Sequence, residues 1–276
     1  MDTSKKISAV IIAFNEAANI GRCIQSVVDL VDEVLVVDSF STDGTVEIAS
    51  SMGARVLQHA FEGHIQQKNW AKDQAAHDWV LSLDADECLS DGLHETLRYA
   101  IQNGLLNGKT KGFIFSRLNH LGDTPIRGCG WYPDAKLRLW DRTCGQWQGR
   151  NPHDKFVIES RYPVQKMEGD ILHYTYADLA AVKLQALKFG KIGGRAIQAE
   201  LVDSAGAPVR NQLTFAFLLF KLITAGLVRF IRNYGLKRGW MYGFHGLAIC
   251  FWQSVEVTLK YGWALPKTNE IGRAHV

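Results

Sequence analysis

Short apolar runs alternate with amphipathic segments through the first hundred residues of the chain. The apolar runs fall at residues 7–13, 33–37, 54–57 and 79–83. Segments with helical spacing follow them, at residues 16–29, 44–52, 63–76 and 91–102. Strands that alternate with helices form βαβ units, in which successive strands lie parallel. The pattern therefore predicts an α/β fold with a mostly parallel central sheet and flanking helices, extended by strands at residues 112–116 and 136–140.

The pattern changes after Tyr176, where helical segments replace the alternation. Residues 177–201 read as one helix, and residues 213–234 form an apolar segment interrupted by basic side chains. Within that segment Thr214, Lys221 and Arg232 are 7 and 11 residues apart, close to whole helical turns, so they share one face opposite an apolar surface. This is typical of a helix that lies in a membrane interface. The alternative is a pair of core helices in a soluble subdomain or a dimer interface.

The uneven distribution of charge bears on the binding partners. The net charge of +3 over 276 residues is too small to indicate nucleic acid. Between Ser204 and Val255, however, there are no acidic residues and six basic ones. An excess of Lys and Arg in an apolar region suits anionic lipid headgroups. Residues 239–255 carry no formal charge and are a borderline membrane-spanning segment.

The cysteines and the chain ends indicate where the protein works. The five cysteines are scattered and never form a C-x-x-C pair, which argues against a disulfide framework or a zinc site. No apolar segment of signal-peptide length opens the chain. We therefore expect the protein to face a reducing cytoplasm. Residues 271–276 match the translation of a widely used sequencing adapter, so residues 270–276 are expected to be a non-native tail.

Acidic residues follow the apolar run at residues 79–83. Asp84, Asp86 and Glu87 stand where a parallel strand ends, the edge at which α/β sheets bind ligands. Strand alternation would send Asp84 and Asp86 to the same side. One carboxylate could then bind Mg²⁺ or Mn²⁺ while the other holds a ribose hydroxyl or a metal-bound water. The alternative is a solvated acidic loop, since a D-x-D pattern also occurs by chance.

The first two strands end in polar residues of a different kind. Phe14, Asn15 and Glu16 replace the Gly-x-Gly turn of a dinucleotide-binding fold, and Glu16 would repel a pyrophosphate, which disfavours NAD or FAD. One interpretation places Asn15 and Glu16 in a pocket for the base and ribose of a nucleotide. The alternative is that these residues begin an ordinary helix. Asp38 closes the second strand, where its carboxylate is placed to accept hydrogen bonds from a ribose or a uracil ring.

These residues together resemble a known family. Residues 7–16, 34–45, 67–69 and 79–87 are similar to the nucleotide-binding half of family 2 glycosyltransferases, which have the Rossmann-like GT-A fold. Further motifs resemble the β-1,4-glucosyltransferase subgroup that adds glucose to the inner-core heptose of bacterial lipopolysaccharide, at residues 130–134, 137–139, 153–154 and 172–176. The resemblance runs from Ile7 to about Tyr261. It implies a GT-A nucleotide-sugar-binding and catalytic domain over residues 1–176 and a helical, acceptor-side or interfacial extension over residues 177–269.

The resemblance also implies roles for the residues at the donor. Asp38 would contact the uridine, Asp84 the ribose or the metal shell, and Asp86 the metal directly. Lys68 stands where the family often has a basic residue near the donor phosphates. His173 could complete the metal shell, as a late histidine does in many GT-A enzymes, or could be a second-shell or core histidine.

The catalytic base has two candidates under the same resemblance. The family's acidic pair after the Arg-containing strand is matched by His153 and Asp154, which leaves Asp154 as the base. Asp134 competes because it follows a loop of Gly and aromatic residues suited to close over a sugar. In that loop Trp131 and Tyr132 are the aromatic residues expected to stack on a sugar face.

The resemblance implies an inverting, metal-dependent enzyme that transfers a hexose, expected to be glucose, from a UDP-sugar to a glycolipid such as lipopolysaccharide core. Its expected partners are the UDP-sugar donor, the glycolipid acceptor, Mn²⁺ or Mg²⁺ and an anionic membrane surface, with no nucleic acid. Its expected location is the cytoplasmic face of the bacterial inner membrane, bound peripherally, or the cytoplasm. Three alternatives stay open: another polysaccharide or lipid-carrier acceptor, a nucleotidyltransferase, and a sugar-nucleotide-binding protein without turnover.

Overall fold

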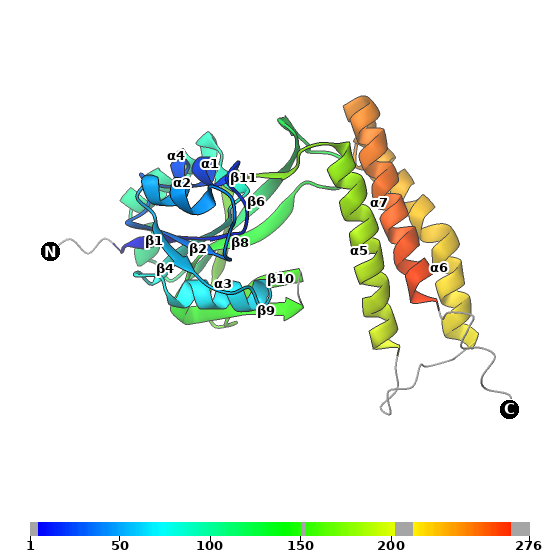
Figure 1. Cartoon of the computed structure of the whole chain (residues 1–276), viewed down its shortest axis with the longest axis horizontal. Helices are drawn as coiled ribbons and strands as arrows, with labels where there is room; N and C mark the ends of the chain where they lie inside the picture. Colours follow the sequence, from blue (N-terminus) through cyan, green and yellow to red (C-terminus); the bar gives the residue numbers. More distant parts are fainter. Residues whose placement is uncertain (1–4, 151–152, 202–211, 266–276) are drawn as a thin grey trace. The chain divides into compact units, whose positions relative to one another are not determined.

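Four parallel strands form one half of the central sheet in the computed structural model (Figure 1). Their order is β3-β2-β1-β4, with bounds β1 (Ile7–Ala13), β2 (Glu33–Asp38), β3 (Arg55–Gln58) and β4 (Trp79–Asp84). All four are paired in parallel, as the alternation of strands and helices predicts. The structure describes residues 5–150, 153–201 and 212–265, so the expected non-native tail lies outside the described residues.

The strands read as unbroken apolar runs because both faces of the sheet are covered. Val36 of β2 packs into a core with helices on one face, and its neighbours Leu35 and Val37 pack into a second core on the other. Figure 1 shows α1, α2 and α4 on the first face and α3 on the second. These helices are α1 (Ile20–Gln25), α2 (Thr45–Ser51), α3 (His64–Asp73) and α4 (Asp91–Gln102).

The other half of the sheet contains antiparallel pairs. It continues from β4 in the order β8-β6-β11-β5, with a short β7 (Thr124–Pro125) beside β6. The bounds are β5 (Glu87–Leu89), β6 (Gly112–Leu121), β8 (Asp134–Asp141) and β11 (Val164–Tyr176). Strand β8 runs antiparallel to β4 and β6, and β11 runs antiparallel to β5. The predicted α/β class is confirmed, while the parallel arrangement is limited to the first half of the sheet.

A two-stranded hairpin outside the main sheet was not predicted. It consists of β9 (Gly145–Arg150) and β10 (His153–Ile158). Phe156 stacks on Trp140 of β8, with ring centroids 3.7 Å apart and planes 4° apart, and Trp147 packs edge-on against both rings. Asn69 of α3 also exchanges hydrogen bonds with the backbone of Trp147. The aromatic stack and α3 therefore fix the hairpin that carries Asp154.

The chain divides into two compact units. The α/β unit holds Met1–His120 and Pro133–Thr175, and the helical unit holds Leu121–Tyr132 and Tyr176–Val276. Within the helical unit α7 (Gly243–Ala264) packs against α5 (Leu179–Glu200) and α6 (Gln212–Phe230). Glycines let these helices approach closely. A Cβ on Gly194 would lie 2.3 Å from Trp263, and one on Gly226 would lie 2.2 Å from Thr258.

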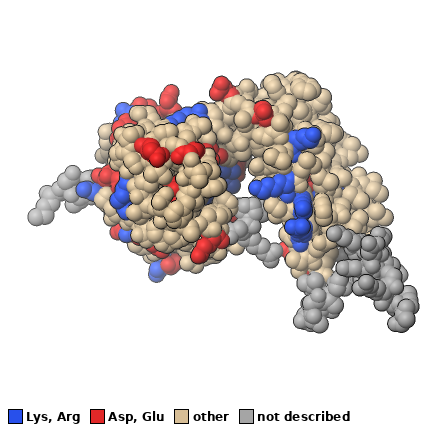
Figure 2. Space-filling model, in the orientation of Figure 1, with Lys and Arg blue, Asp and Glu red and all other residues tan. Residues whose placement is uncertain are grey.

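The helical unit exposes both cations and apolar side chains. Figure 2 shows Lys and Arg side chains gathered over α5, whose exposed basic residues are Lys183, Lys188, Lys191 and Arg195. Large apolar side chains of α6 and α7 are at least half exposed, namely Phe217, Phe220, Ile223, Leu227, Val228, Phe244 and Phe251. No helix in the described part of the chain is long and apolar enough to cross a bilayer. This holds for residues 239–255, which the sequence marked as a borderline membrane-spanning segment.

Candidate active site

The predicted acidic residues meet at the carboxyl edge of the parallel strands. In the sheet register Ala13 of β1 pairs with Asp38 of β2, and Ile12 pairs with Asp84 of β4. The strands thus bring together three loops that are far apart in sequence. This edge is where doubly wound sheets bind their ligands.

Asp84 is held by two cations. Its Oδ1 lies 3.0 Å from Lys68 Nζ on α3, and its Oδ2 lies 3.0 Å from Arg138 Nη2 on β8. Burial by itself would raise the pKa of Asp84, but Lys68 and Arg138 outweigh it and hold that pKa well below its usual range. The Asp84 carboxylate is therefore charged and fixed in place at neutral pH.

Lys68 also reaches the candidate base. Its ammonium is 2.9 Å from Asp154 Oδ2 and 4.6 Å from the centre of the Trp147 ring. The side chain of Asp154 is 9% exposed, compared with 25% for Asp84. A single ammonium thus bridges two carboxylates that come from β4 and β10.

The competing candidate, Asp134, is paired with different cations. Its Oδ2 accepts a hydrogen bond of 2.7 Å from Arg117 Nη2, and its Oδ1 lies 3.2 Å from Lys136 Nζ. Burial would raise the pKa of Asp134, but these two cations lower it. Both candidate bases lie in the α/β unit.

Glu87, which the sequence groups with Asp84 and Asp86 at the ligand-binding edge, is a buried hub that pairs with two arginines. Its side chain has no exposure, and its Oε1 lies 2.6 Å from Arg138 Nη2 and 3.1 Å from Arg117 Nη1. Its Oε2 accepts a hydrogen bond from the backbone N–H of Asp84. Glu87 therefore fixes both the turn after β4 and the arginine that holds Asp84. The sequence contained an indication of this pairing, because Glu87 directly follows the D-x-D pattern and Arg138 lies in a motif that resembles the family.

Asp84 and Asp86 do not share partners, contrary to strand alternation. The strand ends at Asp84, and Ala85 and Asp86 form a tight turn into β5. Asp86 instead lies beside His173 of β11, with Oδ2 and Nε2 3.2 Å apart. The backbone N–H of Tyr174 donates to the Asp86 carbonyl, which keeps β11 beside the turn. The turn therefore gives the two carboxylates different partners.

Asp86 and His173 form a donor pair suited to a divalent cation. Nδ1 of His173 lies 2.6 Å from the amide oxygen of Asn119, so a proton on Nδ1 leaves a lone pair on Nε2. Histidine ligands are typically oriented by a hydrogen bond of this kind. The Asp86 carboxylate and the Thr175 hydroxyl, which is 2.5 Å away, both lie beside Nε2. Among the described residues no three His, Cys, Asp or Glu side chains converge on one point. Two protein ligands fit Mg²⁺-type sites, in which substrate phosphates and water complete the shell.

The residues expected at the nucleoside lie in a network of loop contacts. Asp38 is fully buried, and its Oδ2 accepts a hydrogen bond of 2.9 Å from the Ser41 backbone. Asn15 accepts a hydrogen bond from the Thr42 backbone through its side-chain oxygen. Burial raises the pKa of Glu16, and nearby Asp86, Asp43 and Asp84 raise it further. Glu16 therefore belongs to the same acidic edge as Asp84 and Asp86.

The two predicted sugar-stacking aromatics lie in the helical unit. Trp131 stacks on Tyr176, with ring centroids 4.9 Å apart and planes at 15°. Tyr132 packs under Arg127, whose guanidinium carbon is 4.8 Å from the ring centre. The structure therefore groups Trp131 and Tyr132 with helical residues rather than with the carboxylates of the α/β unit.

Comparison with known proteins agrees with this architecture. The model of glycosyl transferase family 2 matches residues 8–115. An uncharacterized glycosyltransferase of Rickettsia typhi is 48% identical over 88% of this chain and 80% of its own length. The lipopolysaccharide core biosynthesis glycosyltransferase LpsC of Rhizobium meliloti is 38% identical over 87% of this chain and 84% of its own length. The chain belongs to glycosyltransferase family 2. The resemblance drawn from the motifs is confirmed, and with it the expected GT-A fold and glycosyltransferase activity.

One solved structure is also similar over part of the chain. It is the glucosyl-3-phosphoglycerate synthase of Mycobacterium tuberculosis in complex with Mn²⁺, UDP and glucosyl-3-phosphoglycerate. It is 27% identical over 42% of this chain and 44% of its own, with a TM-score of 0.34. A likeness of this extent carries no weight for the site of this glycosyltransferase.

Replacing Glu87 with Gln tests whether the buried charge of this hub stabilises the glycosyltransferase. The substitution keeps the shape but removes the charge that Arg117 and Arg138 share, so the free energy of unfolding should fall by about 3–5 kcal/mol. Urea denaturation measures the loss. Glu95→Gln is the matched control, because Glu95 is 69% exposed where it pairs with Arg98, and its loss should stay below about 1 kcal/mol. Equal losses in the two variants would show that Glu87 is not a hub.

Proposed function

We propose that this family 2 glycosyltransferase is inverting and metal-dependent, and that it transfers glucose from UDP-glucose to a glycolipid such as lipopolysaccharide core. The observation that carries the proposal is the pairing at the carboxyl edge of the sheet. Asp84 and Asp154 share Lys68, while Asp86 faces His173. The similarity to LpsC supports the acceptor class.

Asp154 is the proposed base, which takes the proton of the acceptor hydroxyl as that oxygen attacks the anomeric carbon. The C–O bond to the acceptor forms as the bond to the diphosphate breaks, so the configuration inverts. Asp154 is favoured over Asp134 because, among the described residues, a single cation, Lys68, pairs with it, whereas Asp134 is held by Arg117 and Lys136. A donor diphosphate would attract Lys68 and so free the Asp154 carboxylate.

The donor side uses the remaining acidic residues. A divalent cation, Mn²⁺ or Mg²⁺, bound by Asp86 and His173 would offset the negative charge on the departing diphosphate. Asp84 would hold the ribose, with Arg138 fixing its orientation. Asp38, Asn15 and Glu16 would line the uridine side of the same edge.

The helical unit is the proposed membrane-facing part of the enzyme. Its basic α5 suits anionic headgroups, and the exposed apolar side chains of α6 and α7 suit the region just below them. Peripheral binding at the cytoplasmic face of the inner membrane would bring the enzyme to a glycolipid acceptor.

Asp154→Asn should lower kcat by about 10²–10⁴-fold, because an amide cannot take the acceptor proton. The Kd for UDP-glucose should stay close to that of the wild type. Steady-state transfer assays and isothermal titration calorimetry measure the two quantities. Asp134→Asn is the comparison. If that variant loses turnover while Asp154→Asn keeps it, the assignment of the base is reversed.

Asp86→Ala should weaken Mn²⁺-dependent UDP binding by more than roughly tenfold, since loss of even an outer-shell partner of a metal ligand costs about 10–100-fold in affinity. Calorimetric titration of UDP with and without Mn²⁺ gives the metal-dependent part. Glu47→Ala, on the exposed side of α2, serves as the control. A variant that binds UDP and Mn²⁺ as tightly as the wild type would rule out Asp86 as a ligand.

The enzyme should cosediment with phosphatidylglycerol vesicles at low salt and less at high salt, because salt screens exposed charges beyond a Debye length of about 10 Å at 0.1 M. Phosphatidylcholine vesicles provide the uncharged comparison. Protein that stays in the supernatant with both lipids at low salt would favour a soluble helical subdomain.

A further inference from the structure

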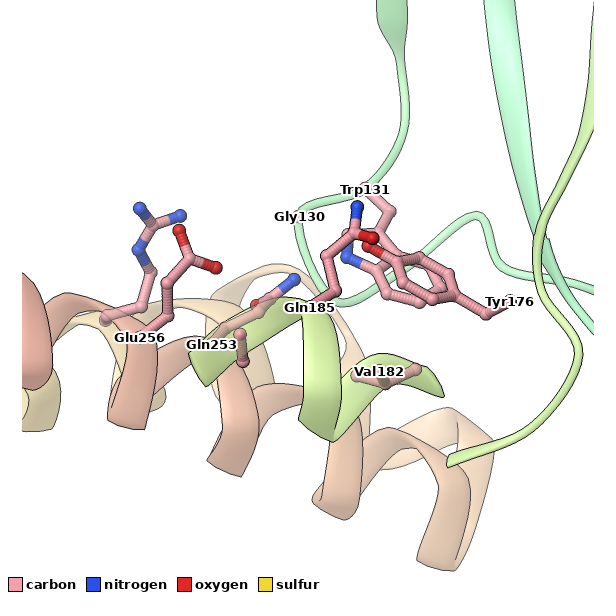
Figure 3. A pocket seen from close by; sticks show the side chains of 9 residues that line it. Gly130, Trp131, Tyr176, Val182, Gln185, Gln253 and Glu256 are labelled. Carbon is pink, nitrogen blue, oxygen red and sulfur yellow. The ribbon is translucent and has the colours of Figure 1, made fainter. Parts of the chain in front are cut away.

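The helical unit contains a cavity of about 140 Å³ that the proposed donor site and catalytic base do not use (Figure 3). Its lining comes from the loop before β8 and from all three long helices, namely Gly130, Trp131, Tyr176, Val182, Gln185, Ala186, Arg229, Gln253 and Glu256. A cavity of about 150 Å³ is large enough to admit one six-membered ring. The space therefore suits a single ring-sized group rather than a long chain.

The lining combines flat aromatic rings with planar polar groups. Trp131 and Tyr176 are stacked in the wall, and Figure 3 shows the Gln185 side chain extending from α5 toward them. Gln253 adds a second amide from α7. An amide offers both donors and an acceptor. Gln253 Oε1 accepts a hydrogen bond from Asn233, so Gln253 turns its N–H donors to a ligand, while Gln185 can supply a donor and an acceptor. Aromatic rings supply a flat apolar surface for the C–H face of a sugar.

The polar wall is fixed before any ligand arrives. Asn233, which is 1% exposed, donates to Gln253 Oε1 at 2.5 Å and accepts from Arg232 Nε at 3.1 Å. Asn233 lies in the π-helical segment η3 (Ile231–Leu236), a local geometry that is frequent at functional sites. Gly130 completes this wall at a φ of +73°, and a Cβ there would lie 3.0 Å from the Asn233 side chain. A residue larger than glycine at position 130 would therefore disturb the Asn233 side chain.

A carboxylate and a guanidinium complete the lining. Burial raises the pKa of Glu256, while Arg229 and Lys260 lower it. With one group of each sign, the cavity has no net charge that would select an anion. Its chemistry instead matches a neutral polyol, which presents donors and acceptors in equal measure.

We propose that this cavity is an acceptor subsite that binds one saccharide ring of the acceptor, with Gln185 and Gln253 holding its hydroxyls and the Trp131–Tyr176 pair against its face. The inference rests on the proposed function, since it identifies where that acceptor's carbohydrate is recognised. The walls are continuous in sequence with the proposed active site. Trp131 precedes Asp134 by three residues, and Tyr176 ends the strand that carries His173.

The test uses the full-length enzyme with a deacylated lipopolysaccharide inner-core oligosaccharide as the probe. Gln185→Ala should raise the acceptor KM about threefold to tenfold, the usual effect of losing one hydrogen bond. Ala186→Leu narrows the cavity without removing a polar group and should raise KM further. Ala196→Ser, at an exposed position on the same helix, should leave KM unchanged. Melting temperatures and UDP-glucose Kd values check that each variant is folded.

Saturation-transfer NMR on the same proteins reads out binding without turnover. The oligosaccharide signal should be present with the wild type and lost with Ala186→Leu. Equal KM values and equal NMR signals in all variants would overturn the subsite and leave the proposed function standing. A wild type that binds the probe through Gln185 but transfers no hexose would instead overturn the proposed function and retain the subsite.

Discussion

A fully enclosed carboxylate, Glu87, is the constraint on which the candidate active site depends. A charge without access to water is costly unless it is paired and hydrogen-bonded. Glu87 is paired with Arg117 from β6 and Arg138 from β8, and it also accepts from the backbone of Asp84. These contacts tie the antiparallel half of the sheet to the end of β4. The balance of one buried charge therefore helps to fix the turn at the carboxyl end of β4.

The need to pair buried charges also gives Asp84 and Asp86 different surroundings. Asp84 is drawn toward Arg138 and Lys68, while Asp86, on the turn between Asp84 and Glu87, is left 24% exposed beside His173. Lys68 extends the chain of alternating charges to Asp154 on the β9–β10 hairpin. Three cations, Arg117, Arg138 and Lys68, thus hold three carboxylates, namely Glu87, Asp84 and Asp154. Asp86 faces a histidine instead.

Much of this could be predicted from the sequence, because parallel strands buried on both faces leave an unambiguous apolar pattern. The ends of those strands then located Asp38, Asp84 and Asp86. The β9–β10 hairpin was missed because β9 carries a single apolar side chain, Trp147, between Gly and Gln residues. Its aromatic partners are Phe156 of β10 and Trp140 of another strand. Helix α1 is shorter than the predicted residues 16–29, since Glu16 accepts turn hydrogen bonds from Asn19 and Ile20. Long-range pairings such as Lys68 with Asp154 leave no local periodicity.

We expect the edge formed by Asp84 and Asp86 to bind the diphosphate of a uridine sugar through a divalent cation. A thermal-shift screen of UDP-, GDP-, CDP- and dTDP-glucose, each with and without Mn²⁺, measures this most directly, because a ligand that binds the folded state raises its melting temperature. UDP-glucose with Mn²⁺ should give the largest rise, and the rise should shrink when the metal is left out. A melting temperature that no nucleotide sugar changes, with or without Mn²⁺, would contradict the account.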